Sequence, residues 1–392
     1  MRRFRIGSLL GIPIQLDLTF LLVLPLFAWI IGTQVGQTAG LLNDSLGAGL
    51  DPALLTDGGL VWVLGVVAAV GLFTGVVLHE LGHSVVAIRF GFPIDSITLW
   101  LFGGVAQLTE MPEDWKQELA IAIAGPIVSV VLGVLSYLVF IVLPATQSTV
   151  LEAARFVFAY LALMNIALAV FNMLPGFPMD GGRVLRALLA RTRSYARATT
   201  IAAEVGKVFA ILLGLFGLFV AGNIFLAGLA FFIYIGAAGE ARQTTMKADL
   251  EGVHVGDVMT PADRVTTVTT DQSVRELIET MFRERHTGYP VERDGELVGL
   301  VTLEDARAVR EVERDAYTVK DVMTTELYTV TPETDVMDAL NELQGNSVGR
   351  LVVTDAEGDF RGLLTRSDVM TALSILRSSE DTGLRSGFGQ NP

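Results

Sequence analysis

The stretch LVWVLGVVAAVGLFTGVVLHELGHSVVAI, residues 60–88, decides the fold of the first half of the chain. It exceeds the roughly 20 residues that a helix needs to cross about 30 Å of hydrocarbon. Its apolar side chains would cover every face of a helix, which favours a membrane over a soluble core. Its only ionisable residues are His79, Glu80 and His83, and ionisable groups in hydrocarbon are costly unless they are compensated. The cluster therefore predicts a functional site inside a membrane-spanning helix.

The spacing within this cluster favours zinc. On a helix, His79 and His83 are four residues apart and project from one face, so that two imidazoles can bind one ion. Glu80 is offset but can reach a water held by the zinc and act as its general base. The alternative is that both histidines are hydrogen-bonded core residues. That alternative does not explain why two histidines and a glutamate occur together in an apolar segment.

A catalytic zinc usually has three protein ligands and an open position for water. The chain has no cysteine, and its other two histidines, His254 and His286, lie in the acidic C-terminal half. The third ligand should therefore be a carboxylate, and Asp180 in NMLPGFPMDGG, residues 172–182, is the best placed. Prolines and glycines break the helix there, so the backbone can turn this carboxylate inward. The alternative is an ordinary helix end with a solvated aspartate.

Six apolar stretches reach or approach the length of a membrane span. They are residues 17–36, 60–88, 119–143, 151–174, 201–220 and 222–239. Lys and Arg flank them on one side, whereas residues 37–59 and 144–150 contain neither. This asymmetry predicts a multi-pass protein of the cell membrane with cytoplasmic N- and C-termini, although Arg155 does not fit it. We predict no removable signal peptide, because the N-terminus lacks a small-residue cleavage pattern.

The segment SITLWLFGGVAQL, residues 96–108, is apolar but too short to span a membrane. Its β-branched and aromatic residues, with two glycines in the middle, predict a short strand or hairpin that dips into the membrane. Such a strand could hold an unwound substrate peptide by pairing at its edge, or it could merely seal the site. These two roles are equally compatible with the residues.

Charge is distributed unevenly along the 392 residues, which are 51% hydrophobic and carry a net charge of −14. Residues 1–240 have a net charge of −2, and residues 241–392 have a net charge of −12. This contrast predicts a membrane domain followed by a soluble appendage. The acidic balance argues against binding of nucleic acid, which needs basic patches. Without cysteine there are no disulfides and no thiolate metal site.

The acidic half contains an internal repeat. VGDVMT at residues 255–260 returns as VKDVMT at 319–324, and GLVTLED at 299–305 returns as GLLTRSD at 362–368. Each copy shows the pattern of a strand, a helix, two strands and a helix. The repeat therefore predicts a pair of small α+β modules.

Two separated motifs of the membrane half occur in a specific order. They are H-E-x-x-H at residues 79–83 and N-x-x-P-x-x-P-x-D-G at residues 172–181, with Gly103-Gly-Val-Ala and Ala124-Gly-Pro126 between them. In this order they resemble the site-2 protease family of intramembrane zinc metalloproteases. The family often has asparagine three residues after the proline of A-G-P, where this chain has Ser129.

This resemblance implies the chemistry of the membrane half. By it, one Zn²⁺ per chain is bound by His79, His83 and Asp180, and Glu80 acts as the acid and base. Asn172 would help to stabilise the developing oxyanion. The implied substrate is a membrane protein with a transmembrane helix, cut within the lipid bilayer.

The repeat, over residues 255–375, resembles a tandem pair of CBS modules, named after cystathionine β-synthase. Such pairs commonly bind adenosine nucleotides such as ATP or AMP. By this resemblance, Asp305 and Asp368 would contact ribose hydroxyls, and Thr302 and Thr365 would contact phosphate. The arginines available to hold phosphate are Arg350, Arg361 and Arg366. The alternative is a structural pair without a ligand, or one that forms a homodimer.

These observations combine into one predicted architecture and one predicted function. We predict a polytopic α-helical membrane domain with six spans over residues 1–240, a linker over 241–254, CBS modules over 255–312 and 319–375, and a flexible tail over 376–392. The predicted function is regulated intramembrane proteolysis by a zinc metalloendopeptidase, with nucleotide binding to the CBS pair as a means of regulation. The competing interpretation, a membrane transporter or channel gated by the CBS pair, explains buried charge but not the ordered zinc motif.

Overall fold

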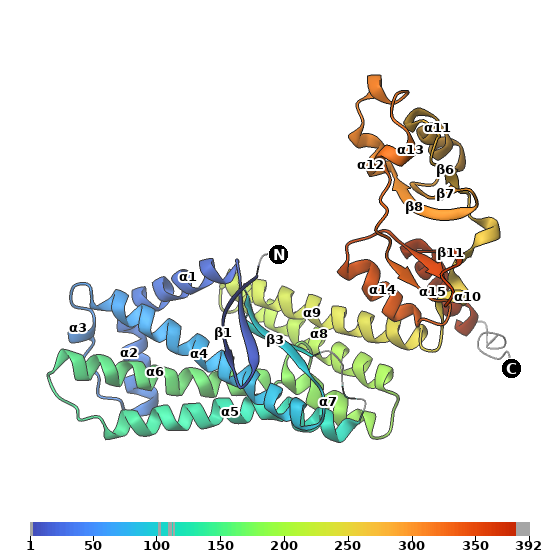
Figure 1. Cartoon of the computed structure of the whole chain (residues 1–392). Helices are drawn as coiled ribbons and strands as arrows, with labels where there is room; N and C mark the ends of the chain where they lie inside the picture. Colours follow the sequence, from blue (N-terminus) through green and yellow to red (C-terminus); the bar gives the residue numbers. More distant parts are fainter. Residues whose placement is uncertain (1–2, 101–102, 109–111, 113, 382–392) are drawn as a thin grey trace. The chain divides into compact units, whose positions relative to one another are not determined.

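Helices dominate the first of the two units into which the chain divides, Met1–Thr244 and Thr245–Pro392 (Figure 1). The computed structural model describes residues 3–100, 103–108, 112 and 114–381. Five described helices of the first unit are long and apolar enough to cross a membrane. They are α4 (Leu60–Arg89), α5 (Trp115–Val142), α6 (Thr149–Asn172), α8 (Tyr195–Phe219) and α9 (Ile224–Asp249). These helices match the second to sixth predicted spans.

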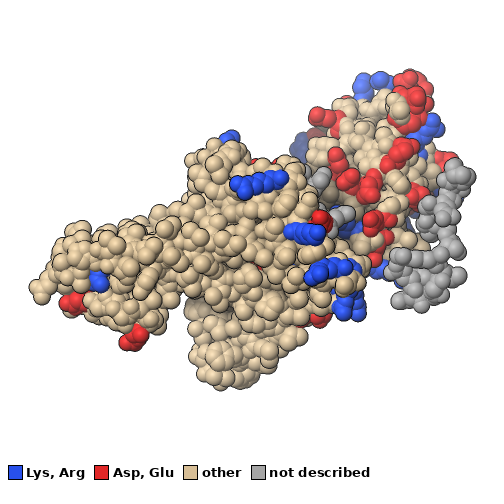
Figure 2. All heavy atoms as spheres, turned by 90° about the horizontal axis from the view of Figure 1, so that it is seen from below, with Lys and Arg blue, Asp and Glu red and all other residues tan. Residues whose placement is uncertain are grey.

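The surface of these helices suits lipid. Val142, Phe219 and Phe225 are 80, 79 and 86% exposed, which would be costly in water. Figure 2 shows that the visible face of the first unit is largely free of charged side chains, whereas Asp and Glu are abundant on the second unit. The predicted division into an apolar half and an acidic half therefore appears on the molecular surface.

The first predicted span, residues 17–36, is broken. It contributes α1 (Phe20–Thr33), and the chain then bends by 68° at Gln34 into α2 (Val35–Leu46). A sixth span is present only if this bent pair counts as one. Residues 37–59, between the first two predicted spans, contain most of α2 and the short helix α3 (Pro52–Leu55).

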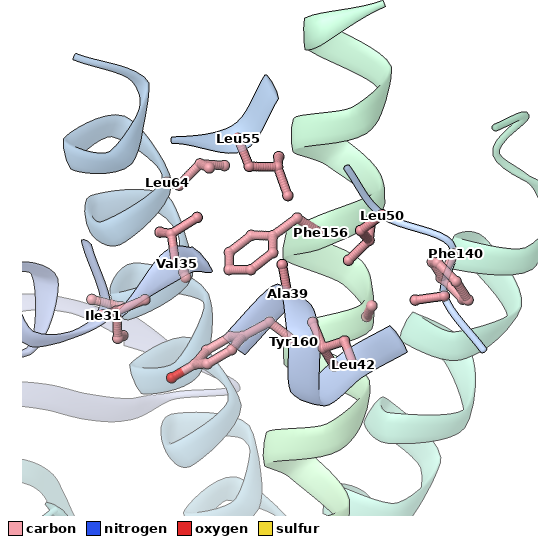
Figure 3. Close-up of a cluster of buried hydrophobic side chains, with 14 of the residues drawn as sticks. Ile31, Val35, Ala39, Leu42, Leu50, Leu55, Leu64, Phe140, Phe156 and Tyr160 are labelled. Atoms are coloured by element: carbon pink, nitrogen blue, oxygen red, sulfur yellow. The ribbon is translucent and has the colours of Figure 1, made fainter. Parts of the chain in front are cut away.

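Packing against the other helices accounts for the bend. Val35, Ala39 and Leu42 form one face of α2, and each is at most 1% exposed. Figure 3 shows this face beside Phe156 and Tyr160 of α6. Burying a side chain the size of valine or leucine stabilises the fold by about 1.5–3 kcal/mol. A short helix folded back onto the bundle is therefore favoured over a straight continuation of α1.

Arg155, which does not fit the predicted orientation, is buried in α6. Its guanidinium donates a 2.8 Å hydrogen bond to the carbonyl oxygen of Ala48 and lies 3.5 Å from the carboxylate of Glu152. Glu152 also accepts a 2.7 Å hydrogen bond from the backbone N–H of Asp51. Because this pair ties the segment after α2 to α6, Arg155 is explained by packing and does not report on orientation.

A four-stranded sheet packs against α4. Its order is β1 (Arg3–Leu9), β2 (Ile12–Asp17), β3 (Ile94–Trp100) and β4 (Gly103–Leu108), and among these described strands β2 and β3 pair in parallel and the other neighbours antiparallel. The hairpin predicted over residues 96–108 is confirmed as β3 and β4. Ile97 and Leu99 project from one face of β3 and pack near Leu81 and Phe73 of α4. The N-terminal hairpin of β1 and β2 is not among the elements predicted from the sequence.

The second unit contains one sheet for each repeat (Figure 1). One has the order β6 (Val268–Thr269), β7 (Gly288–Arg293), β8 (Glu296–Thr302), and the other β5 (Thr260–Pro261), β11 (Phe360–Thr365), β10 (Arg350–Thr354), β9 (Thr329–Val330). The α-helices are α10 (Val255–Val258), α11 (Val274–Glu284), α12 (Leu303–Ala308), α13 (Val319–Val322), α14 (Val336–Gly345) and α15 (Arg366–Asp381), with 3-10 turns at Ala262–Arg264 and Glu311–Glu313. The predicted order of strand, helix, two strands and helix is confirmed in both repeats.

The first segment of each repeat packs in the fold of the other repeat. β5 of the first repeat pairs with β11 of the second, and Val255 is buried in the second core beside Leu364. In return, Val319 of the second repeat is buried in the first core together with Leu277. The two repeats are therefore interlocked rather than placed side by side.

Two predicted boundaries differ from the structure. The predicted linker, residues 241–254, is helical as far as Asp249, because α9 continues through good helix formers such as Ala, Arg, Gln, Met and Lys. The predicted flexible tail, residues 376–392, begins inside α15, which ends at Asp381. Residues 382–392 lie outside the described part of the chain.

Candidate metal centre

Three predicted ligands meet at one point of the first unit. Nε2 of His79 lies 3.1 Å from Oδ2 of Asp180, Nε2 of His83 lies 3.3 Å from the same oxygen, and the two Nε2 atoms are 3.2 Å apart. A tetrahedral zinc with ligand bonds near 2.0 Å requires donor atoms about 3.3 Å apart. The three donors therefore form one face of a tetrahedron of the right size and leave the fourth position free for water.

Helix α5 orients both histidines. Nδ1 of His83 donates a 2.7 Å hydrogen bond to the carbonyl oxygen of Ile121, and since a carbonyl can only accept, Nδ1 carries the proton. Nδ1 of His79 lies 2.9 Å from Oγ of Ser129. With Nδ1 engaged on both rings, Nε2 is left to face the metal position. Ser129, whose role the motif leaves open, thus contacts a predicted ligand directly.

Glycine residues make the room that the site needs. A Cβ atom on Gly125 of α5 would lie 2.2 Å from Nε2 of His83 and 2.7 Å from Nε2 of His79. No side chain fits there, which accounts for the central glycine of A-G-P. In the same way, a Cβ on Gly181 would lie 2.2 Å from the carbonyl oxygen of Leu174, so D-G allows the turn that precedes Asp180 to fold tightly.

Asp180 is the first residue of α7 (Asp180–Ala190), which packs against α5 and α8. Its side chain is 14% exposed. A carboxylate at a helix N-terminus is favoured by the helix dipole, which helps to hold the charge there. The break after α6 thus turns the carboxylate inward, as the prolines and glycines of residues 172–182 predict.

Glu80 and Asn172 lie at the edge of this triangle. Glu80 follows His79 on α4, and a Cβ on Gly104 of β4 would lie 2.7 Å from the Cγ atom of Glu80. Strand β4 therefore passes directly beside the predicted base. Asn172 ends α6, and its Nδ2 lies 3.5 Å from Nε2 of His79. All five residues singled out in the membrane half are thus brought together.

The residues singled out in the repeats are paired within each repeat. The hydroxyl and the backbone N–H of Thr302 donate to Asp305 at 2.6 and 2.8 Å, and Thr365 does the same to Asp368 at 2.8 Å for both bonds. In the first repeat these bonds form a capping box at the N-terminus of α12. Helix capping therefore accounts for these residues without a ligand.

Arg350 stands apart from the other two candidate arginines. Arg361 pairs with Asp355, and Arg366 donates to backbone carbonyl oxygens. Arg350 of the second repeat reaches Thr287 of the first, where Nη2 donates to the hydroxyl at 3.1 Å. Its Nη1 is buried with no partner among the described residues, and burial lowers the pKa of this guanidinium.

A buried network close to the metal centre is not predicted by the sequence analysis. Arg186 of α7 pairs with Glu118 of α5 and Glu240 of α9. One sequence signal is Glu118, the one acidic residue within the apolar helix α5, where an unpaired acid would be costly.

Membrane-spanning helices that converge two histidines and an aspartate, beside a glutamate, define an intramembrane zinc metalloprotease. The sequence comparisons agree: residues 67–155 and 144–213 match peptidase family M50, and residues 255–311 and 319–375 each match the CBS domain. The chain belongs to family M50, that of the site-2 proteases, and carries a CBS pair.

Known relatives are similar to this chain in sequence over nearly their whole length. A zinc metalloprotease from Methanocaldococcus jannaschii is 34% identical over 378 residues, which cover 96% of this chain and 98% of the relative. Rip3 from Mycobacterium tuberculosis is 33% identical over 391 residues, which cover 96% of this chain and 94% of the relative. Among solved structures, a site-2 protease from M. jannaschii is 37% identical and covers 62% of this chain and 96% of that one, with a TM-score of 0.43.

Proposed function

We propose that this multi-pass membrane zinc metalloprotease hydrolyses peptide bonds in or near the transmembrane segments of membrane-anchored proteins. The observation that carries the proposal is the triangle of His79, His83 and Asp180 within helices whose other residues are mostly apolar. A peptide bond can reach these residues only from a segment that enters the same region. Transmembrane segments have that property, and soluble loops do not.

Each residue of the site has a proposed role. His79, His83 and Asp180 hold one zinc ion, which when bound polarises the scissile carbonyl and acidifies water. Glu80 takes a proton from the attacking water and passes it to the leaving amine. Asn172 donates from Nδ2 to the carbonyl oxygen as negative charge develops there.

A helical substrate must unwind locally before its peptide bonds are accessible. Strand β4 lies at the edge of its sheet, and Gly104 places this strand beside Glu80. We propose that the unwound peptide pairs with this edge. Val105→Pro and Ala106→Pro test it, since neighbouring residues of a strand point their N–H groups to opposite sides. The variant that removes an N–H from the free edge should stop cleavage, and intact cleavage by both would favour a sealing role.

The N- and C-termini are proposed to be cytoplasmic, on the basis of the flanking Lys and Arg residues. The absence of cysteine allows a direct test with single cysteines at two exposed sites, Ser8→Cys and Ser45→Cys. A membrane-impermeant thiol reagent added to intact cells should label only the cysteine at position 45. Labelling only at position 8 would reverse the orientation.

The CBS pair is proposed to bind an adenosine nucleotide and thereby to regulate cleavage. The support is the partnerless Nη1 of Arg350 beside Thr287, since a guanidinium with a free donor can bind phosphate. Asp305 and Asp368 would bind ribose hydroxyls after exchanging their bonds to Thr302 and Thr365. Equal cleavage with and without ATP or AMP would contradict regulation. Homodimerisation through the CBS modules is a separate proposal, tested by the mass of the purified particle.

The alternative of a transporter or channel gated by the CBS pair is set aside, because the chain belongs to a peptidase family. The decisive experiment measures cleavage of a single-span substrate by the purified, zinc-loaded protein and by Glu80→Gln. We expect cleavage by the parent protein alone, with stoichiometric zinc in both. Absence of stoichiometric zinc from the parent protein would overturn the proposed function.

A further inference from the structure

A guanidinium group is buried between three helices of the membrane unit. Arg186 of α7 is 1% exposed. Its Nε donates to Glu118 of α5 at 2.6 Å, and its Nη1 donates to Glu240 of α9 at 2.8 Å. The planar group also lies between the rings of Phe177 and Tyr195, with centroid distances of 4.8 and 4.6 Å. Held by two carboxylates and two rings, Arg186 has one fixed position.

The bond between Arg186 and Glu118 joins α7 to α5, and both helices contribute to the metal centre. Helix α7 begins with Asp180, six residues before Arg186. Glu118 precedes Ile121 on α5 by one turn, and the carbonyl oxygen of Ile121 accepts the hydrogen bond that orients His83. Arg186 therefore connects the helix that supplies the carboxylate to the helix that orients an imidazole. A shift of α7 against α5 would change the distance between Asp180 and the two Nε2 atoms.

The third helix adds a connection to the soluble half. Glu240 lies on α9, which runs without interruption from Ile224 to Asp249. Within the second unit, Met246 packs against the core of the second repeat, and Asp249 accepts a 2.8 Å bond from Arg377 of α15. The helix that supplies Glu240 thus ends in the folded CBS pair.

We propose that Arg186 is a positioning residue for Asp180 and that Glu240 makes this positioning depend on α9. The inference rests on the proposal that His79, His83 and Asp180 hold zinc. Without Glu240, the guanidinium loses one of its two charged anchors and α7 is less firmly held. The distances from Oδ2 of Asp180 to the two histidine Nε2 atoms then depart from those that zinc requires, and zinc binds more weakly. If the contacts of Arg186 served folding alone, loss of Glu240 would change the stability of the protein but not its affinity for zinc.

The test measures the zinc dissociation constant of the purified full-length protein by competition with a chelator. Glu240→Ala should raise this constant about tenfold, the lower end of the effect of losing a partner that orients a ligand. Glu240→Gln keeps an oxygen that can accept from Arg186 and should lie between Glu240→Ala and the parent. The matched control is Glu204→Ala on α8, whose carboxylate forms an exposed pair with Lys207. This control should leave the constant unchanged.

Cobalt substitution and a double-mutant cycle give readouts independent of cleavage. The visible spectrum of the Co²⁺-loaded protein should shift in Glu240→Ala, because the ligand geometry changes, and should not shift in Glu204→Ala. In an Arg186→Lys background, where the compact ammonium cannot hold both carboxylates as a fork does, Glu240→Ala should have little further effect. If Glu240→Ala and Arg186→Lys had additive effects on the zinc dissociation constant, Glu240 would not act through Arg186, and the inference would be overturned.

The outcomes separate the inference from the proposed function. If the parent protein binds zinc and Glu240→Ala and Glu240→Gln bind it equally well, the inference fails and the proposed function stands. If the parent protein binds no zinc, the proposed function fails and the inference falls with it. If Glu240→Ala does not fold, the spectrum and zinc constant of Glu240→Gln decide, and parent-like values there overturn the inference.

Discussion

Oγ of Ser129 lies 2.9 Å from Nδ1 of His79, and neither residue is more than 3% exposed. A hydroxyl can serve as donor or acceptor, so it fits whichever hydrogen bond the bound imidazole needs. The group that hydrogen-bonds to a metal-binding histidine fixes the orientation of its ring, and its loss typically weakens metal binding about ten- to a hundredfold. Ser129 is such a group, and it occupies the position where the family often has asparagine.

Loss of this hydroxyl should weaken metal binding. We expect Ser129→Ala to raise the zinc dissociation constant by roughly tenfold, because His79 is then free to rotate. The control is Thr199→Ala on α8, which also removes a buried hydroxyl but one that bonds only to the carbonyl oxygen of Tyr195. Chelator competition measures both. An unchanged constant in Ser129→Ala would show that packing alone orients His79.

A side chain at the central glycine of A-G-P should exclude the ion. Gly125→Ala places a Cβ 2.2 Å from Nε2 of His83, so the imidazole must move away from the metal position. We expect zinc content to fall to less than about a tenth of the parent value, because two of three ligands are displaced. Gly228→Ala is the control, since nothing lies within 4 Å of its added atom. Full zinc content in Gly125→Ala would contradict the geometry of the site.

The pair of Arg155 and Glu152 should matter for stability rather than for catalysis. Arg155→Met leaves a buried carboxylate without its cation, which should lower the free energy of unfolding by about 3–5 kcal/mol. Adding Glu152→Gln removes the uncompensated charge and should restore much of that loss. Thermal unfolding in detergent measures both variants. A double variant as unstable as the single one would mean that the loss comes from the bond to Ala48.

Phosphate binding by the CBS pair should depend on Arg350. If its free Nη1 meets a phosphate, Arg350→Ala should weaken binding of ATP or AMP about ten- to a hundredfold, the range for a charge-assisted hydrogen bond. Arg361→Ala is the matched control, since that guanidinium is already paired with Asp355. Calorimetric titration of the full-length protein gives the constants. Equal weakening by both variants would indicate a general charge effect.

The sequence predicts the long helices and the histidine pair because both follow from strong local signals. Asp180 could be chosen because few polar groups exist at its depth, so a process of elimination was possible. The bend at Gln34 could not be predicted in this way, since the packing of α2 against distant residues of α6 decides it. Arg186 also gives no signal, because arginines in an amphipathic helix such as α7 are typical of a solvated surface.

The N-terminal hairpin is an intermediate case. Apolar and polar side chains alternate over residues 3–6 and again over 14–17, and Gly11 provides the turn between them with a positive φ of 84°, following Leu10 at 50°. This pattern is the signature of a two-residue hairpin and could have been found. The segment is too short to cross a membrane, so it is not among the predicted spans.

Neither CBS repeat can be cut out as a self-sufficient piece. Leu250 and Val255 precede the sheet of the first repeat. Both are fully buried, but in the core of the second repeat. A fragment that begins with the first repeat, at Val255, therefore lacks Leu250 and has a cavity in the core of the second repeat. To stay folded, an excised second unit has to begin upstream of Leu250 and carry both repeats. A single repeat can complete its core only by exchanging segments with a second copy of itself.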